Sequence, residues 1–281
     1  MTIAITGASG QLGRLAIEEL KKRVSSGEII ALARTPSKVA DLGVNTREAD
    51  YQKPETLRSA FEGVDTLVLI SSSDFDDRAG QHRNAINAAK EAGVARIIYT
   101  SILKGENSPM LLAQDHIATE AAIRESGISA TILRNGWYTE NYTASLGGAL
   151  QAGAMIGSSG DGRVASATRA DYAEAIAVVA ADDSHAGKTY ELAGDEAFTL
   201  AEMAAEVSRQ SGKEIPFNNM PKEAYAEVLT SFGLPEGFSM ILADADSHSA
   251  KGALLDESKT LSSLIGRPTT PMAKAVAAAL A

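Results

Sequence analysis

Three glycines near the N-terminus have the spacing of a loop that holds the phosphates of a dinucleotide. Gly7, Gly10 and Gly13 follow an apolar run, Thr2–Thr6, and precede a stretch with helical periodicity. The first glycine lets the chain turn, the second lets the backbone approach a pyrophosphate, and the third lets the helix pack against the strand. The free N–H groups at the start of such a helix attract an anion. A strand before the loop and a helix after it are the context that the motif requires, so it predicts a dinucleotide site.

Arg34 indicates which dinucleotide this site prefers. It ends the apolar run Ile29–Ala33, about twenty residues beyond the glycines, where an NAD site places a carboxylate for the ribose 2′-hydroxyl and an NADP site an arginine for the 2′-phosphate. A guanidinium can bond a phosphate through two N–H groups, whereas a carboxylate would repel it. An ordinary surface arginine is the alternative interpretation. The sequence therefore favours NADP over NAD.

Two further groups of polar and aromatic side chains follow apolar runs. The serines Ser71–Ser73 come directly after Thr66–Ile70, which places them at the carboxyl edge of a parallel sheet, where ligands bind in such folds. A polar loop without a ligand is the alternative. Trp137, Tyr138 and Tyr142 follow a later apolar run. An aromatic ring there could stack on a flat ligand and a tyrosine hydroxyl could form a hydrogen bond with it, or one or two of these rings could simply pack between the lobes of the protein.

These groups need a scaffold, and the first half of the chain has the pattern of one. Short, continuously apolar runs alternate with helix-length segments, which is typical of βαβ units around a parallel sheet covered on both faces. The predicted strands are Thr2–Thr6, Ile29–Ala33, Asn45–Glu48, Thr66–Ile70, Arg96–Thr100 and Ala130–Leu133. The predicted helices are Gly10–Ser25, Pro36–Leu42, Pro54–Phe61, Arg78–Ala92 and Ala113–Ser126.

The pattern loosens after Arg134, where glycines and serines become frequent. Thr189–Leu192 is predicted as a strand, and Leu200–Ser211 as a helix capped by Thr199. Three more helices are predicted at Lys222–Phe232, Gly237–Ala245 and Pro271–Ala281. We therefore expect a Rossmann-type α/β fold with a doubly wound parallel sheet. The cofactor-binding core spans residues 1–134, and residues 135–281 add the remaining strands and a smaller, mostly helical substrate lobe over the open sheet edge, which is not an independent domain.

The composition excludes several classes of function. The 281 residues include 26 Lys and Arg against 36 Asp and Glu, a net charge of −10, and this acidity disfavours nucleic acid as a partner. The absence of cysteine excludes disulfides, iron–sulfur clusters and a thiol nucleophile, and the four histidines lack metal-ligand spacing, so no metal is expected. No apolar run is long enough to span a membrane, and no signal peptide precedes the first strand, so we predict a cytoplasmic protein that is a monomer or a homodimer.

Several of these residues together resemble a known family. The glycine loop resembles that of atypical short-chain dehydrogenases, and Thr131–Asn141 resembles their NmrA-like branch. With the serines and the run Ser166–Tyr172, the whole chain looks similar to bacterial NADPH:quinone oxidoreductases and triphenylmethane reductases. The resemblance implies that NADPH reduces a quinone or another flat conjugated small molecule. It also implies that a segment over the nicotinamide completes the cofactor site. The cofactor-binding residues expected on this basis are Gly7, Ser9, Gly10, Gln11, Leu12, Arg34, Ser71, Ser72, Ser73, Asn135, Gly136, Trp137, Tyr138, Thr139 and Glu140.

One departure from the wider superfamily points to the kind of substrate. No tyrosine is followed four residues later by lysine, so the Tyr-x-x-x-Lys acid–base pair of alcohol-oxidising members is absent. A quinone accepts a hydride readily and gives a stable anion, so it needs less protonic help than an alcohol does. Stacking the acceptor at about 3 to 3.5 Å from the nicotinamide then becomes the main task of the protein.

Tyr138 and His116 are the candidate catalytic residues. Tyr138 could bond the acceptor oxygen, and His116 could donate a proton near neutral pH. His116 lies four residues before Glu120 on one predicted helix face, which is equally typical of a structural contact. Two other functions stay open: a non-catalytic NADP-binding regulator of the NmrA type, and a reductase of dyes or imines.

Overall fold

The computed structural model describes residues 1–74 and 77–281, which divide into two compact units. Unit 1 consists of Met1–Gly105, Asp115–Asn135 and Arg169–Tyr190. Unit 2 consists of Glu106–Gln114, Gly136–Thr168 and Glu191–Ala281. The chain thus leaves unit 1 and returns to it twice, so residues that are far apart in the sequence build one core.

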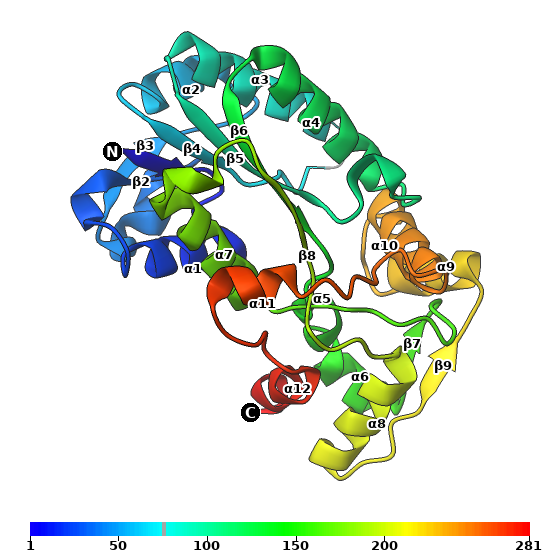
Figure 1. Cartoon of the computed structure of the whole chain (residues 1–281). Coiled ribbons are helices and arrows are strands. Elements are labelled where there is room, and N and C mark those ends of the chain that lie inside the picture. The colour runs from blue at the N-terminus through cyan, green and yellow to red at the C-terminus, as the bar shows by residue number, and fades with distance from the viewer. Residues whose placement is uncertain (75–76) are drawn as a thin grey trace. The chain divides into compact units, whose positions relative to one another are not determined.

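A seven-stranded sheet organises unit 1 (Figure 1). Its strands are β1 (Ile3–Ile5), β2 (Ile29–Ala33), β3 (Asn45–Glu48), β4 (Thr66–Leu69), β5 (Arg96–Ile102), β6 (Ser129–Asn135) and β8 (Thr189–Leu192). They lie in the order β3-β2-β1-β4-β5-β6-β8. The first six pair in parallel, with β1 between β2 and β4. This order reverses direction beside β1, which makes a Rossmann-type fold and confirms the predicted class.

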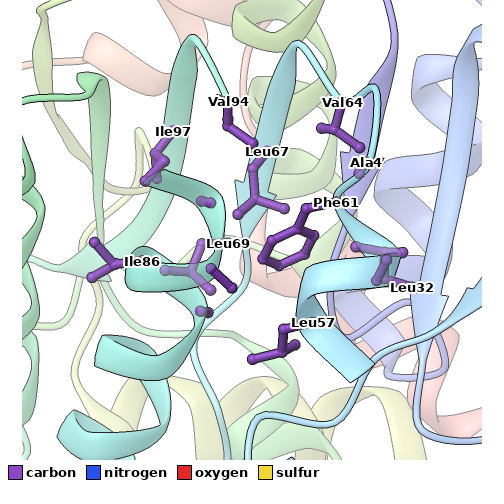
Figure 2. Close-up of a cluster of buried hydrophobic side chains, with 14 of the residues drawn as sticks. Ala4, Leu32, Leu57, Phe61, Val64, Leu67, Leu69, Ile86, Val94 and Ile97 are labelled. Atoms are coloured by element: carbon purple, nitrogen blue, oxygen red, sulfur yellow. The ribbon is translucent and has the colours of Figure 1, made fainter. Parts of the chain in front are cut away.

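Alternate side chains of the strands fill two cores, because successive residues of a strand point to opposite faces. On one face Leu32, Leu67 and Leu69 pack against Leu57 and Phe61 (Figure 2). The helices that cover this face are α2 (Pro54–Ala60), α3 (Arg78–Glu91) and α4 (Ala113–Ser126). Burial of one such large apolar side chain contributes about 1.5–3 kcal/mol.

The opposite face is covered by α1 (Gln11–Leu20) and α7 (Arg169–Ala181), which pack against each other. Sequence reasoning missed α7. Tyr172, Ile176 and Val179 are fully buried, and so are alanines on other sides of the helix. A helix buried all round shows no apolar stripe, so its period gives no signal. The unit accordingly draws on residues well beyond Arg134.

Unit 2 is mostly helical, with one small sheet. It contains α5 (Glu140–Thr143), α6 (Leu146–Ala152), β7 (Met155–Gly157), α8 (Leu200–Ser211), β9 (Phe217–Asn219), α9 (Lys222–Ser231), α10 (Glu236–Ser249), α11 (Thr260–Ile265) and α12 (Met272–Leu280). β7 and β9 pair in parallel. Met203, Val207 and Val276 are among the side chains that form its core.

Most predicted elements are present, with ends shifted by a few residues. The Thr199 hydroxyl accepts a hydrogen bond from the Glu202 N–H, and the Glu202 carboxylate accepts one from the Thr199 N–H, so the predicted cap is a full capping box. Pro36–Leu42 is a 3-10 helix rather than an α-helix. The predicted helix Gly10–Ser25 is shorter and ends at Leu20. The short elements α5, α6, α11, β7 and β9 were not predicted, because each is too brief to show a period.

None of the helices within residues 1–74 and 77–281 is long and apolar enough to cross a membrane. No group of three His, Asp or Glu side chains in the same ranges is arranged to hold a metal ion.

Candidate cofactor site

The glycine loop connects β1 to α1 and leaves the start of the helix open. Gly7 has a φ of +62°, a left-handed conformation that favours glycine. A Cβ at Gly13 would overlap the Gly7 carbonyl oxygen, so the close approach of helix to strand requires glycine there. Gly10 is the N-cap residue of α1, and no side chain caps that end. Gly10 and Gln11 are exposed, while Leu12 is buried in the core.

These features make the N-terminus of α1 suited to an anion. Its first N–H groups lack intrahelical acceptors, and no acidic residue lies in the first turn. The partial positive charge of the helix end then favours a phosphate. Ser9 is exposed in the same loop.

Arg34 lies where β2 ends and has a free guanidinium. The side chain is exposed and makes no hydrogen bond or ion pair with the residues that the structure describes. Arg14, a nearby cation on α1, differs because its Nη1 lies 2.8 Å from Asp41 Oδ2. An arginine that is already paired has to give up that partner to bind a phosphate, and Arg34 does not.

The serine loop after β4 is held by hydrogen bonds to its backbone and side chain. The Ser71 N–H donates to Thr100 Oγ1 at 2.9 Å. Three side chains of α3 hold Ser72: Arg78 Nε donates to its carbonyl at 2.7 Å, Gln81 Oε1 accepts from its hydroxyl at 2.8 Å, and His82 Nε2 accepts from its N–H at 2.9 Å. Ser73 is exposed. The loop is therefore built by α3 as much as by the strand.

The acceptor role of His82 Nε2 fixes the tautomer of the ring. The proton must lie on Nδ1, which is 2.8 Å from Thr119 Oγ1, and that hydroxyl donates in turn to the Asp115 carbonyl at 2.7 Å. Burial, and then the charge of Arg78, lowers the pKa of His82 to about 3. The ring is therefore neutral at physiological pH.

His116 lies in the interior of unit 1, against Tyr99. Its Nδ1 is 2.8 Å from the Tyr99 hydroxyl, and only 6% of the residue is exposed. Burial lowers the pKa of His116 well below its usual value, so the imidazole holds no second proton at neutral pH. This placement favours a structural role, and the catalytic role of His116 stays a prediction.

Asn135 ends β6 and has an unsatisfied side chain. It is 4% exposed, and both its amide oxygen and its amide nitrogen lack a hydrogen-bond partner among the described residues. Its backbone carbonyl accepts a hydrogen bond from the Leu103 N–H at 2.8 Å, which fixes its place beside β5. Leaving such a buried amide unpaired costs about 1–3 kcal/mol for each group.

The next five residues, 136–140, belong to unit 2, where they pair with the start of the run Ser166–Tyr172. Tyr138 forms a parallel bridge with Ala167. Thr139 Oγ1 lies 2.9 Å from Ser166 Oγ, and the Thr139 N–H donates to the Ala167 carbonyl. Trp137 is 8% exposed and Tyr138 is half-buried. The segment is therefore an ordered strand-like stretch that ends where α5 begins. Its remaining members are Gly136 and Glu140.

The residues present fit a dinucleotide. The glycines form a cradle that a Cβ would fill. Within residues 1–74 and 77–281, no side chain caps the helix that follows, none pairs with Arg34, and none bonds the Asn135 amide. The glycine loop with its helix end is complementary to a pyrophosphate, the Arg34 guanidinium to a 2′-phosphate, and the Asn135 amide to a carboxamide.

Sequence reasoning missed the side chains that support the site. Arg78, Gln81 and His82 fall at spacings of three and four on α3 and so share one face. That spacing, just after a serine loop, was a signal for them. Tyr51 is a further support. Its hydroxyl lies 2.5 Å from Thr6 Oγ1 and 2.8 Å from the Ile70 carbonyl oxygen, so this ring supports the sheet edge.

Several known proteins are similar to this chain over most of its length. A family model described as NAD(P)H-binding matches residues 7–183. Quinone oxidoreductase 2 of Escherichia coli is 53% identical over 98% of this chain and 97% of its own. The crystal structure of an NADPH-dependent quinone oxidoreductase from Escherichia coli, complexed with NADPH, matches with a TM-score of 0.96 and 52% identity over the full length of both chains. Triphenylmethane reductase from Citrobacter sp., complexed with NADP(H), matches with a TM-score of 0.93 and 38% identity over 99% of this chain and all of its own.

Proposed function

Because the chain belongs to the NAD(P)H-binding family, we propose that it is an NADPH-dependent oxidoreductase that reduces a quinone or a similar flat conjugated acceptor by direct hydride transfer. One observation carries this proposal. The identity of 53% to the Escherichia coli quinone oxidoreductase extends over 98% of the chain. It therefore includes the helical unit 2 as well as the cofactor loop, and a shared Rossmann core alone would not produce that.

The residues of unit 1 would bind the cofactor at several points. Backbone N–H groups from Gly10 to Leu12 would hold the pyrophosphate at the start of α1, and Arg34 would bond the 2′-phosphate. Asn135 would pair its amide with a carboxamide, which would satisfy both of its orphaned atoms. The Ser71–Ser73 loop, held rigid by α3, would present N–H and hydroxyl groups at the sheet edge.

NADPH supplies the hydride when it is bound, and the protein supplies orientation. The segment that contains Trp137 and Tyr138 offers rings on which a flat acceptor can stack, and Tyr138 is the proposed contact with the acceptor oxygen. Without a Tyr-x-x-x-Lys pair, the chain is suited to an acceptor whose reduced form is a stable anion. This favours quinones over alcohols and ketones.

A turnover assay tests the proposal. Purified protein should oxidise NADPH when a benzoquinone or naphthoquinone is added, with loss of absorbance at the nicotinamide band and formation of hydroquinone in equal amount. A protein that binds NADPH but reduces no quinone in such a panel would favour the NmrA-type regulator. Turnover of triphenylmethane dyes or imines alone would move the substrate to that class. The cytoplasmic location and the monomeric or homodimeric state stay predictions of the sequence.

A further inference from the structure

Unit 2 contains a buried tyrosine hydroxyl that forms no hydrogen bond with the described residues. The Tyr142 hydroxyl, on the first turn of α5, is inaccessible to solvent and has no hydrogen-bond partner among the described residues. The backbone N–H of Tyr142 donates to the Thr139 carbonyl at 3.0 Å, so Tyr142 lies directly after the segment that pairs with Ser166 and Ala167. An unpaired buried hydroxyl destabilises the folded protein, so a bound molecule that accepted its hydrogen bond would relieve that cost.

A buried carboxyl group borders the same core as Tyr142. Tyr142 packs against the core of unit 2 beside Leu200 and Phe217, and a Cβ at Gly157 would meet both of these side chains as well as the carboxylate of Asp246. Asp246 of α10 is 5% exposed, and its Oδ2 accepts the Ser158 N–H at 2.5 Å. A Cβ at Gly157 would come within 2.7 Å of the same oxygen, so the glycine makes room for the carboxyl. The Asp246 charge contributes to raising the pKa of both Tyr142 and Tyr225, after burial as the main cause. Tyr142 and Asp246 therefore border the same part of the core of unit 2, and Tyr225 lies on α9, which packs against α10.

Charged side chains close to Asp246 in the sequence and on α9 pair with one another and not with Asp246. Asp244 Oδ1 lies 3.6 Å from Lys222 Nζ and 3.5 Å from His248 Nε2, and its Oδ2 accepts the Leu111 N–H. No cation pairs with Asp246 among the described residues. Burial, opposed by the Ser158 N–H, raises the pKa of Asp246 to about 6. A substantial fraction of this carboxyl therefore keeps its proton in weakly acidic solution.

Quinone reduction requires a proton that a hydride does not bring. A quinone takes up two electrons and two protons to become a hydroquinone, and a hydride carries both electrons with one proton. The second must come from an acid at the acceptor oxygen or from water. His116 is poorly suited, because burial keeps its ring neutral and its Nδ1 faces Tyr99.

We propose that Tyr142, Tyr225 and Asp246 form the polar end of the acceptor site, where Tyr142 donates a hydrogen bond to a carbonyl oxygen and Asp246 supplies the second proton. The carboxyl O–H bond breaks as an O–H bond forms on the acceptor, and the resulting carboxylate takes a proton from solvent. This inference rests on the proposed quinone reduction and adds the residues that would serve it.

Two substitutions test the inference in the full-length protein. Tyr142→Phe removes only the hydroxyl, so the KM for the quinone should rise about three- to tenfold, the value of one hydrogen bond, at unchanged affinity for NADPH. The Tm should not fall, because the lost group had no partner. A hydroxyl with a purely structural role would give the opposite result, a lower Tm with unchanged KM.

Asp246→Asn keeps an acceptor for the Ser158 N–H but has no acidic proton. We expect kcat to fall about 10- to 100-fold, the lower part of the range for a general acid. In the wild type kcat should decline as the pH rises through about 6, where Asp246 loses its proton. The variant should lack that decline.

Matched controls separate these effects from general damage. Tyr190→Phe removes a hydroxyl that bonds His185 Nδ1, and Asp65→Asn alters a carboxylate that accepts the Thr2 N–H. Both should keep the wild-type KM and pH profile. Calorimetric titration of the NADP⁺-loaded protein with hydroquinone gives a second reading, in which Tyr142→Phe should weaken binding by the same factor.

The outcomes distinguish the two proposals. If the wild type reduces quinones and both variants match it in KM, kcat and pH profile, the acceptor site is not here although the enzyme function stands. If the wild type reduces no quinone, both proposals fail together.

Discussion

Arg34 shows how a single side chain can set cofactor preference. Its guanidinium is exposed at the end of β2 and unpaired among the described residues, whereas Arg14 already bonds Asp41. A carboxylate at this position would repel a 2′-phosphate and accept a 2′-hydroxyl. The preference of the enzyme for NADPH should therefore depend on position 34 far more than on any other surface cation.

Replacement of that arginine gives the clearest test of cofactor choice. Arg34→Asp should weaken NADPH binding about 100-fold, because a charge-assisted bond is lost and repulsion takes its place, while NADH binding should change by less than about threefold. Binding of both cofactors can be measured by calorimetry. Arg58→Asp, which breaks the surface pair with Glu91, is the control and should alter neither. Equal losses for both cofactors would remove Arg34 from the phosphate site.

Single residues also show what the sequence could and could not predict. Gly7, Gly13 and Thr199 were predictable because each performs a local backbone task that its neighbours reveal. The unsatisfied state of Asn135 and the burial of Asp246 were not, since both depend on what distant segments bring around them. A residue's local backbone role can be predicted from its neighbours in the sequence, whereas its burial and loss of hydration cannot.

Helix α3 is the element on which the serine loop depends. Its first two turns supply Arg78, Gln81 and His82 to the carbonyl, the hydroxyl and the N–H of Ser72. The helix has little amphipathic pattern because polar residues lie on its buried side. Those polar residues make the helix part of the site as well as part of the core.

Replacement of His82 should separate its positioning role from packing. His82→Gln offers an amide oxygen to the Ser72 N–H and should keep the KM for NADPH within about threefold, whereas His82→Phe cannot accept and should raise it about tenfold. Steady-state kinetics with saturating quinone measure the difference. Similar KM values for both variants would show that the ring only fills space.

The same residue should make stability depend on pH. Because the folded protein holds His82 neutral, with a pKa of about 3 against an ordinary 6.5, its stabilising effect is complete above pH 6.5 and is lost as the pH falls toward 3. Urea unfolding gives the free energy of unfolding at each pH. Between about pH 3 and 6.5, this free energy should rise with pH less steeply in His82→Gln than in the wild type, by about 1.4 kcal/mol per pH unit. An unchanged slope would mean that the ring titrates freely.

Long helices and strands were easier to predict than short ones, and so were elements with one apolar and one polar face. The strands β2 and β3 and the helix α4 have the predicted bounds, and most other errors are at the ends. α7 was missed because it is buried on all sides. The short helices of unit 2 form because tertiary contacts stabilise them, and propensity alone would not make them stable.

At the scale of the whole molecule, unit 1 is assembled from three separate stretches of chain. Arg169–Tyr190 returns to it after residues that belong to unit 2, and α7 in that stretch packs against α1. A fragment cut after residue 134 therefore keeps α1 but lacks α7, one of the two helices that cover one face of the sheet. Exposure of that much apolar surface leads to aggregation or a loosely packed state.

Truncation tests this dependence. Residues 1–134 alone should show no cooperative thermal transition and should bind a hydrophobic dye. The comparison protein joins residues 1–135 to residues 169–190 through a Gly–Ser linker equal in length to residues 136–168, and it should unfold cooperatively. Circular dichroism and dye fluorescence measure both. Cooperative unfolding of the short fragment would show that α7 is dispensable.

The amide of Asn135 and the hydroxyl of Tyr142 carry a consequence for laboratory evolution. Both are buried without a partner, so apolar replacements such as Asn135→Val and Tyr142→Phe relieve a cost of the folded state. A library screened only for heat resistance, with neither nucleotide nor acceptor in the medium, should therefore enrich such replacements. The enriched variants would have a higher Tm and a lower catalytic activity. A screen that is meant to keep both stability and activity therefore has to select for heat resistance and turnover together.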